Sequence, residues 1–229
     1  MIISATTFDK RIKPIVALAL VAPALWLGWQ WWLYFQGQPS ALGFEPGEFT
    51  HEFTGFSAIR VLLISLAVSP FARLSKFKII MRARRMVGLF AFFYVMLHLF
   101  GYLWLQQGWD VAAIMRDVGK RTYIQVGMAA AIVLVPLAAT STNAMIKRVG
   151  GKLWKRIHKG VYVAGVLAVS HQFLVVKGNQ PEPYIHGAIL ALLLLERAHA
   201  YAKCAKWYDR AAGWFGLGPN VEEGARRRL

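Results

Sequence analysis

The stretch RIHKGVYVAGVLAVSHQF, residues 156–173, is apolar enough for a membrane span, yet it places a histidine near each end. These histidines are His158 and His171. Ionisable side chains inside membrane spans are rare, face the interior of the helix bundle, and mark functional sites. The stretch therefore predicts a membrane protein whose function depends on imidazole.

The whole chain has the composition of a membrane protein. Its 229 residues are 57% hydrophobic and carry a formal net charge of +16. A bilayer-spanning helix needs about 20 apolar residues, and the sequence offers six such runs: 14–35, 56–71, 86–107, 122–140, 158–176 and 183–201. The first run is longer than a signal-peptide core, which indicates a retained span. We therefore expect an all-α membrane protein, a six-transmembrane-helix bundle that forms a single integral membrane domain over residues 1–229.

Basic residues collect on alternate loops, and this pattern predicts the orientation of the chain. Lys and Arg are dense before the first run, between the second and third, between the fourth and fifth, and in the tail 202–229. The positive-inside rule places these segments in the cytoplasm. We therefore expect a multi-pass protein with both termini cytoplasmic. Because the basic residues lie beside the ends of the spans, we expect them to contact the headgroups of the lipid bilayer. A nucleic-acid partner is not expected.

Two of the histidines lie at a common depth. Counting from the cytoplasmic ends of the third and fifth runs places His98 about 18 Å and His171 about 20 Å into the membrane. Two neutral imidazoles at one depth on different helices can ligate a haem iron from opposite faces. The single cysteine, Cys204, excludes a c-type haem attachment and a cysteine-ligated iron–sulfur cluster. We therefore expect a haem between helices three and five, with a proton relay through the same histidines as the alternative.

Small residues beside both histidines leave room for a porphyrin. Ala91 and Gly101 share a helix face with the first histidine, and Ala164 and Ala168 share one with the second. Small residues also allow close helix packing in membranes. Beside two depth-matched histidines, however, they favour the haem.

His158 lies at the cytoplasmic end of the fifth run, where a second haem would need another ligand at the same depth. Counting down the third run from His98 reaches Arg84 and Arg85 instead of a histidine. His158 is also rotated about 140° from His171 around the helix. A second haem with another ligand, a contact to a propionate, flavin or lipid phosphate, and a plain interfacial position all stay open. An interfacial position is expected for the three remaining histidines: His51, His186 and His199.

Four stretches carry a resemblance to a known family: FTGFSAIRVLLISLAVSPFARL (53–74), RARRMVGLFAFFYVMLHLFGY (82–102), TYIQVGMAAAIVLVPLAATSTNAM (122–145) and KLWKRIHKGVYVAGVLAVSHQFLVVK (152–177). They resemble the MsrQ family, once called YedZ, the haem-binding membrane subunits of the bacterial periplasmic methionine-sulfoxide reductase system. That family belongs to the ferric-reductase-like transmembrane group, which includes the membrane part of NADPH oxidases. The resemblance marks residues 53–177 as the expected ferric-reductase-like haem-binding core.

The resemblance implies a transmembrane electron-transfer subunit of the bacterial inner membrane. Members carry b-type haem and pass electrons from the quinone pool or a cytosolic flavin reductase to a periplasmic, molybdopterin-containing methionine-sulfoxide reductase that repairs oxidised proteins. FMN is associated with the family. The chain is therefore expected to be a redox subunit without its own substrate-reducing site.

The family's ligand positions fall on His98, His158 and His171. NADPH oxidases carry two histidines on each of the two equivalent helices, and this chain lacks the fourth, so one or two haems are implied. Arg84 and Arg85 match an RR pair of the family and are expected to meet haem propionates or a flavin phosphate as bidentate donors. Two alternative functions remain: a b-type haem subunit of another membrane dehydrogenase or quinol oxidase, and a histidine-relay proton-coupled transporter.

Overall fold

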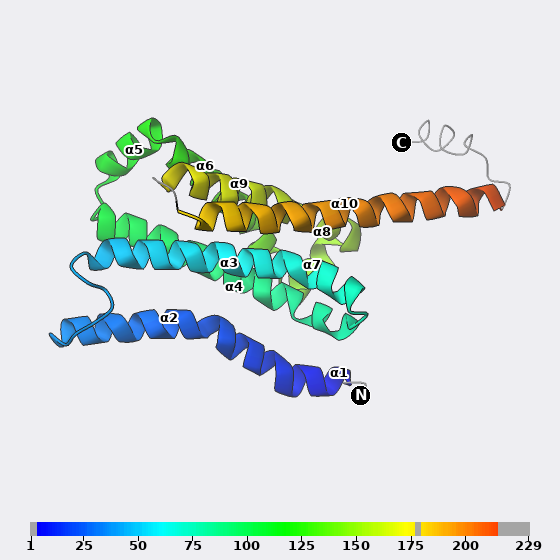
Figure 1. Cartoon of the computed structure of the whole chain (residues 1–229), viewed down its shortest axis with the longest axis horizontal. Helices are drawn as coiled ribbons and strands as arrows, with labels where there is room; N and C mark the ends of the chain where they lie inside the picture. The colour runs from blue at the N-terminus through cyan, green and yellow to red at the C-terminus, as the bar shows by residue number, and fades with distance from the viewer. Residues whose placement is uncertain (1–3, 177–179, 215–229) are drawn as a thin grey trace. The chain divides into compact units, whose positions relative to one another are not determined.

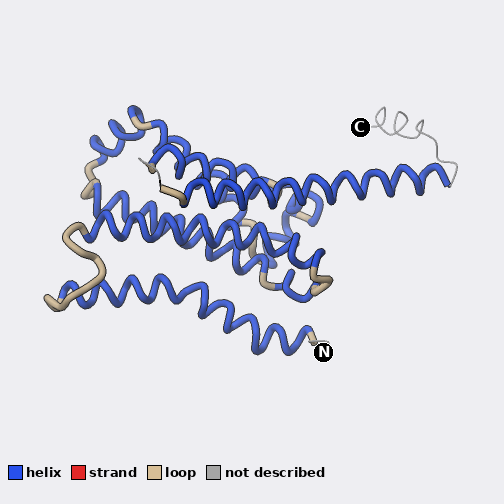
Figure 2. The backbone as a smooth tube through the Cα atoms, in the orientation of Figure 1, coloured by secondary structure: helices blue, strands red, loops and turns tan. Residues whose placement is uncertain are grey.

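The computed structural model describes residues 4–176 and 180–214, with side chains up to residue 203. The chain divides into a first unit, Met1–Leu190, and a second unit, Ala191–Leu229. Every regular element among the described residues is helical (Figure 2). The expected all-α class is therefore confirmed for this part of the chain. Residues 215–229 of the expected tail lie outside the described residues.

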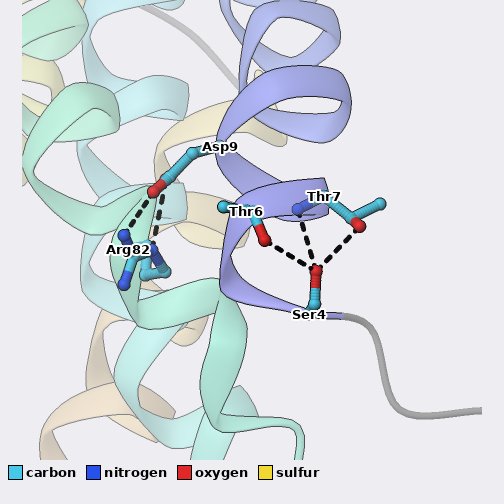
Figure 3. A network of polar contacts seen from close by, with 5 residues as sticks. All are labelled: Ser4, Thr6, Thr7, Asp9 and Arg82. Carbon is cyan, nitrogen blue, oxygen red and sulfur yellow. Dashed lines mark hydrogen bonds and ion pairs between the residues drawn. The ribbon is translucent and has the colours of Figure 1, made fainter.

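The first long helix begins close to the predicted position. Helix α1 (Ala5–Thr7) and a π-helical segment, Phe8–Ile12, lead into α2 (Lys13–Phe35). Ser4 caps α1 by accepting a hydrogen bond from the Thr7 amide at 3.1 Å (Figure 3). Asp9 forms an ion pair with Arg82, whose Nε donates to Asp9 Oδ1 at 3.1 Å (Figure 3). This pair joins the N-terminal segment to a short 3₁₀ helix, Lys78–Arg82, that precedes α4.

Helix α3 (Pro46–Leu74) begins ten residues before the run expected at 56–71. Pro46 suits the first helical turn because that turn leaves its amides without helical partners. Two polar residues are then satisfied within the helix, since Thr50 Oγ1 donates to Pro46 O and Thr54 Oγ1 donates to Thr50 O, each at 2.7 Å. The extension places His51 on the helix instead of in a loop.

Two helix pairs form the centre of the first unit (Figure 1). Helix α3 pairs with α4 (Arg84–Gly101), which continues as the π-helical segment Tyr102–Gln106. Helix α6 (Thr122–Ala139) pairs with α9 (Gly160–Val175). The pairs also touch through α3 with α9 and α4 with α6. Buried residues fill their meeting point: Ala58, Val61, Leu62, Val87, Ala91, Tyr94, Leu134, Leu137 and Ala164.

The connections contain short helices that the sequence reading left as loops. Helix α5 (Val111–Lys120) follows Asp110, whose side chain accepts from two backbone amides. Asp117 fastens it by accepting from Gln107 Nε2 at 2.9 Å and pairing with Arg121 at 3.0 Å. On the other connection, α7 (Asn143–Val149) and α8 (Gly151–Ile157) lie between α6 and α9.

Four helical stretches among the described residues are long and apolar enough to cross a membrane: Ala5–Phe35, Pro46–Leu74, Arg84–Gln106 and Thr122–Ala139. They present large apolar side chains outward, as Leu18 (65% exposed) and Ile132 (66% exposed) illustrate. Helix α9 has only 16 residues. Helix α10 (Glu182–Trp214) runs on past the expected end at 201. These stretches support a multi-pass membrane protein, and the count of six spans stays a prediction.

Candidate functional site

The structure brings His98 of α4 and His171 of α9 together at the meeting point of the two helix pairs. Their ring centroids are 6.2 Å apart, and the ring planes are 79° from each other. The sequence predicted that the two histidines lie at one depth and hold a haem between them. The packing of the helix pairs brings their rings close to one another.

The second ring nitrogen of each histidine has a fixed partner. His98 Nδ1 donates to the backbone oxygen of His51 at 2.9 Å, and His171 Nδ1 donates to that of Tyr123 at 2.7 Å. A carbonyl oxygen only accepts, so Nδ1 must carry the proton in both rings. In a neutral imidazole the lone pair then lies on Nε2. Histidines that bind metals are held in this way, with the other ring N–H on a carbonyl or carboxylate.

Two glycines let the helices approach these rings. A Cβ on Gly55 of α3 would lie 3.0 Å from His98 Cε1, and one on Gly127 of α6 would lie 2.9 Å from His171 Cε1. Each glycine follows, by four residues, the residue whose carbonyl holds the same ring. The same local arrangement therefore occurs in each helix pair. A backbone carbonyl accepts the hydrogen bond from Nδ1, and a glycine one helical turn later packs against the ring.

This geometry fits an iron held between two imidazoles. A bond from a first-row metal to an imidazole nitrogen is about 2.0 Å, so two axial rings have centroids about 6 Å apart, close to the 6.2 Å found here. Haem iron accepts histidine ligands of this kind. Of the expected small residues, Ala91 and Ala164 are fully buried, and a Cβ on Gly101 would meet nothing within 4 Å. The residues that make room beside the rings are the two glycines of the neighbouring helices, which sequence reasoning missed.

His51 is the other residue that sequence reasoning missed. We expected an interfacial side chain, but its ring stacks on His98 with centroids 3.9 Å apart and planes 24° from each other. His51 Nδ1 is buried without a hydrogen-bond partner. The signal that could have revealed it is Pro46, which allows α3 to begin before His51.

His158 lies apart from this pair, in the turn between α8 and α9. Its ring stacks on Trp154 at 4.0 Å, its Nδ1 donates to Trp154 O at 3.0 Å, and its Nε2 lies 3.4 Å from Ser141 Oγ. Burial lowers the pKa of His158, and the positive charge of Arg84 lowers it further, while the bond to Trp154 opposes them. No second histidine faces His158 among the described residues.

The arginine pair lies on the same side as His158. Arg84 is close enough to act on the charge of that imidazole. Arg85 Nη1 donates to Asn143 Oδ1 at 2.6 Å, which links the start of α4 to the start of α7. His158, Arg84 and Arg85 are hereafter called the cytoplasmic cluster, after the orientation that the charge pattern predicts.

The last two histidines behave differently from one another. His186 was expected at the interface but is buried, with 6% of its surface exposed, and its Nδ1 lies 2.8 Å from Gln172 Oε1. This bond joins the start of α10 to α9. His199 is exposed within the second unit, and its interfacial position stays a prediction.

Comparison with known proteins places the chain in a family. The family model described as "Ferric reductase like transmembrane component" matches residues 54–169. Three relatives carry the name "Protein-methionine-sulfoxide reductase heme-binding subunit MsrQ". The one from Rhodospirillum rubrum is 47% identical and covers 82% of this chain and 88% of its own length. That from Xanthomonas campestris pv. campestris strain 8004 is 44% identical, covering 80% and 83%.

The third relative, from Polaromonas naphthalenivorans, is 42% identical and covers 80% of this chain and 81% of its own. These matches extend over most of the chain and include both helix pairs and the cytoplasmic cluster. The chain therefore belongs to the MsrQ family of ferric-reductase-like transmembrane proteins.

Proposed function

We propose that this protein is the haem-binding membrane subunit of a protein-methionine-sulfoxide reductase system. It passes electrons across the bacterial inner membrane from the quinone pool or a cytosolic flavin reductase. The acceptor is a periplasmic, molybdopterin-containing reductase that repairs oxidised proteins. Family membership and the names of the relatives support this proposal.

The observation that carries the proposal is the pair of imidazoles 6.2 Å apart, each with its Nδ1 on a backbone carbonyl. His98 and His171 would hold a b-type haem through their Nε2 atoms. The bound haem would supply reversible one-electron chemistry, and these two imidazoles and the burial of the site would tune its potential. The same hydrogen bonds argue against a proton relay, because a backbone carbonyl cannot pass on the proton that Nδ1 carries.

The direction of transfer rests on the charge pattern. Both termini and the two basic loops are cytoplasmic in this proposal, since Lys and Arg accumulate there. His98 then lies near the periplasmic end of α4, and the cytoplasmic cluster lies near the opposite end. An electron therefore has a place to enter on one side of the membrane and a place to leave on the other.

The cytoplasmic cluster is proposed as the entry site. Its guanidinium groups are suited to a propionate or to the phosphate of FMN, since Arg binds planar and tetrahedral anions with two parallel hydrogen bonds. His158 keeps its Nε2 lone pair, with Ser141 Oγ 3.4 Å away. The cluster would hold either a second haem with one histidine ligand or the phosphate of FMN.

Reconstitution in vesicles tests the proposal. The protein is inserted, its haem is reduced with reduced flavin or quinol, and reoxidation is followed by absorbance. We expect faster reoxidation only when the periplasmic reductase and methionine sulfoxide are both present outside. Equal rates without either one would show that the acceptor is wrong. Vesicles of the unchanged protein that receive methionine sulfoxide without the reductase serve as the control for electron leakage through the vesicle membrane.

A further inference from the structure

The ring of His51 stacks on that of His98, a residue proposed to ligate the haem. We propose that its imidazole is a positioning residue: by stacking on His98, it fixes the ring plane of that ligand and holds the ligand on the haem iron. The inference rests on the proposed haem site and assigns a role to a side chain that is not itself a ligand.

The backbone of His51 restrains the His98 ring at one atom only. The hydrogen bond from His98 Nδ1 to His51 O, at 2.9 Å, lies at the edge of the ring and tolerates some change of direction as the ring turns about its Cβ–Cγ bond. A second ring stacked 3.9 Å away, with planes 24° apart, blocks that rotation on the covered face.

His51 Nδ1 is buried and makes no hydrogen bond, which costs free energy in a folded protein. The ring of His51 contacts two other rings, that of His98 with centroids 3.9 Å apart and that of Tyr102 with centroids 6.3 Å apart. The closer of these contacts is the one with the proposed ligand.

The other ligand supplies an internal comparison. Tyr123 holds His171 through its carbonyl as His51 holds His98, but its ring is 6.4 Å away and tilted by 44°. Both proposed ligands therefore donate the same kind of hydrogen bond, but among the described residues only the His98 ring has another ring stacked closely on it. If stacking positions the ring, removing the His51 side chain must matter more than removing that of Tyr123.

The test uses His51→Ala, which removes the ring and keeps the carbonyl, and His51→Phe, which keeps a stacking ring. Tyr123→Ala is the matched control. Two properties are measured on haem-loaded protein: the largest g value of the low-spin electron paramagnetic resonance signal, and the fraction of reduced haem that binds carbon monoxide. Carbon monoxide enters only when one iron–imidazole bond breaks, so it reports how firmly the ligand is held.

We expect His51→Ala to retain haem, to shift the largest g value, and to raise the carbon-monoxide-binding fraction about two- to tenfold, the range set by one aromatic contact. His51→Phe should return both values toward wild type, and Tyr123→Ala should change them less. Wild-type values in His51→Ala, or no rescue by His51→Phe in a protein that keeps its haem, would overturn this inference. If the wild-type protein binds no haem, the proposed function fails as well. That outcome is distinguishable from the failure of His51 alone.

Discussion

The close approach of Gly127 to His171 makes a sharp prediction about a single methyl group. In Gly127→Ala the new Cβ would lie 2.9 Å from both Cε1 and Nδ1 of His171. Ordinary contacts begin near 3.4 Å, so the ring must retreat by about 0.5 Å. The ring is not free to do so, because its Nδ1 is held 2.7 Å from Tyr123 O and its Nε2 is proposed to hold iron.

The size of the effect follows from this clash. Overpacking a well-filled site costs about 1–3 kcal/mol, and a difference of that size corresponds to about five- to 150-fold weaker haem retention. Alanine itself favours the helix by about 1 kcal/mol over glycine. The helix should therefore form normally, and the loss should appear in the haem site alone.

The assay measures the ratio of haem to protein and the rate at which haem leaves for an added scavenger. Gly88→Ala is the matched control, because this glycine lies on α4 ten residues before His98 and a Cβ there would meet only Ser65 Oγ, at the ordinary contact distance of 3.4 Å. It gains the same helix propensity without the clash. Gly55→Ala should resemble Gly127→Ala, since its Cβ would lie 3.0 Å from His98 Cε1. If both variants retain haem as firmly as Gly88→Ala, the close contact of glycine and ring does not matter.

Three further predictions concern the cytoplasmic side and the limits of the chain. His158→Ala should keep the signal of the His98–His171 haem. It should either lose a second haem signal or be reduced more slowly by the cytoplasmic donor, as followed by stopped-flow absorbance. An unchanged haem count and an unchanged reduction rate would show that His158 has no redox role. Reporters fused after residue 150 should be cytoplasmic and those near 113 and 180 periplasmic, and the opposite pattern would reverse the direction of electron flow. The purified chain alone should not oxidise NADH or NADPH and should not reduce methionine sulfoxide. Its sequence carries no dinucleotide-binding pattern and no molybdenum site. Turnover of any of these compounds by the pure protein would contradict this prediction.

The sequence was sufficient for the helical class and for the proposed ligand pair. Long apolar runs predicted α2, α4 and α6 within a few residues, because the membrane demands a fixed length of apolar helix. Helical rise alone placed His98 and His171 at one depth, and the structure sets their rings 6.2 Å apart. Both inferences depend on local geometry, which a single sequence specifies well.

Contacts between helices could not be read in the same way. Gly55 and Gly127 are close to the rings only because α3 packs on α4 and α6 packs on α9. Residues on the same helix as each histidine, such as Ala91, could be counted from the sequence, but residues on a neighbouring helix could not. His51 was missed for another reason: the polar residues before 56 suggested a loop, while hydroxyl-to-backbone bonds and Pro46 let the helix begin earlier.

The central claim is that His98 and His171 hold one haem between them. Its most direct test is the spectrum of the purified protein, by absorbance and electron paramagnetic resonance, beside those of His98→Ala and His171→Ala. We predict a low-spin, bis-histidine b-haem signal, strongly anisotropic because the ring planes are 79° apart. Each substitution should abolish that signal or greatly weaken it. A variant that kept both wild-type haem content and the low-spin signal would show that the iron has a different ligand.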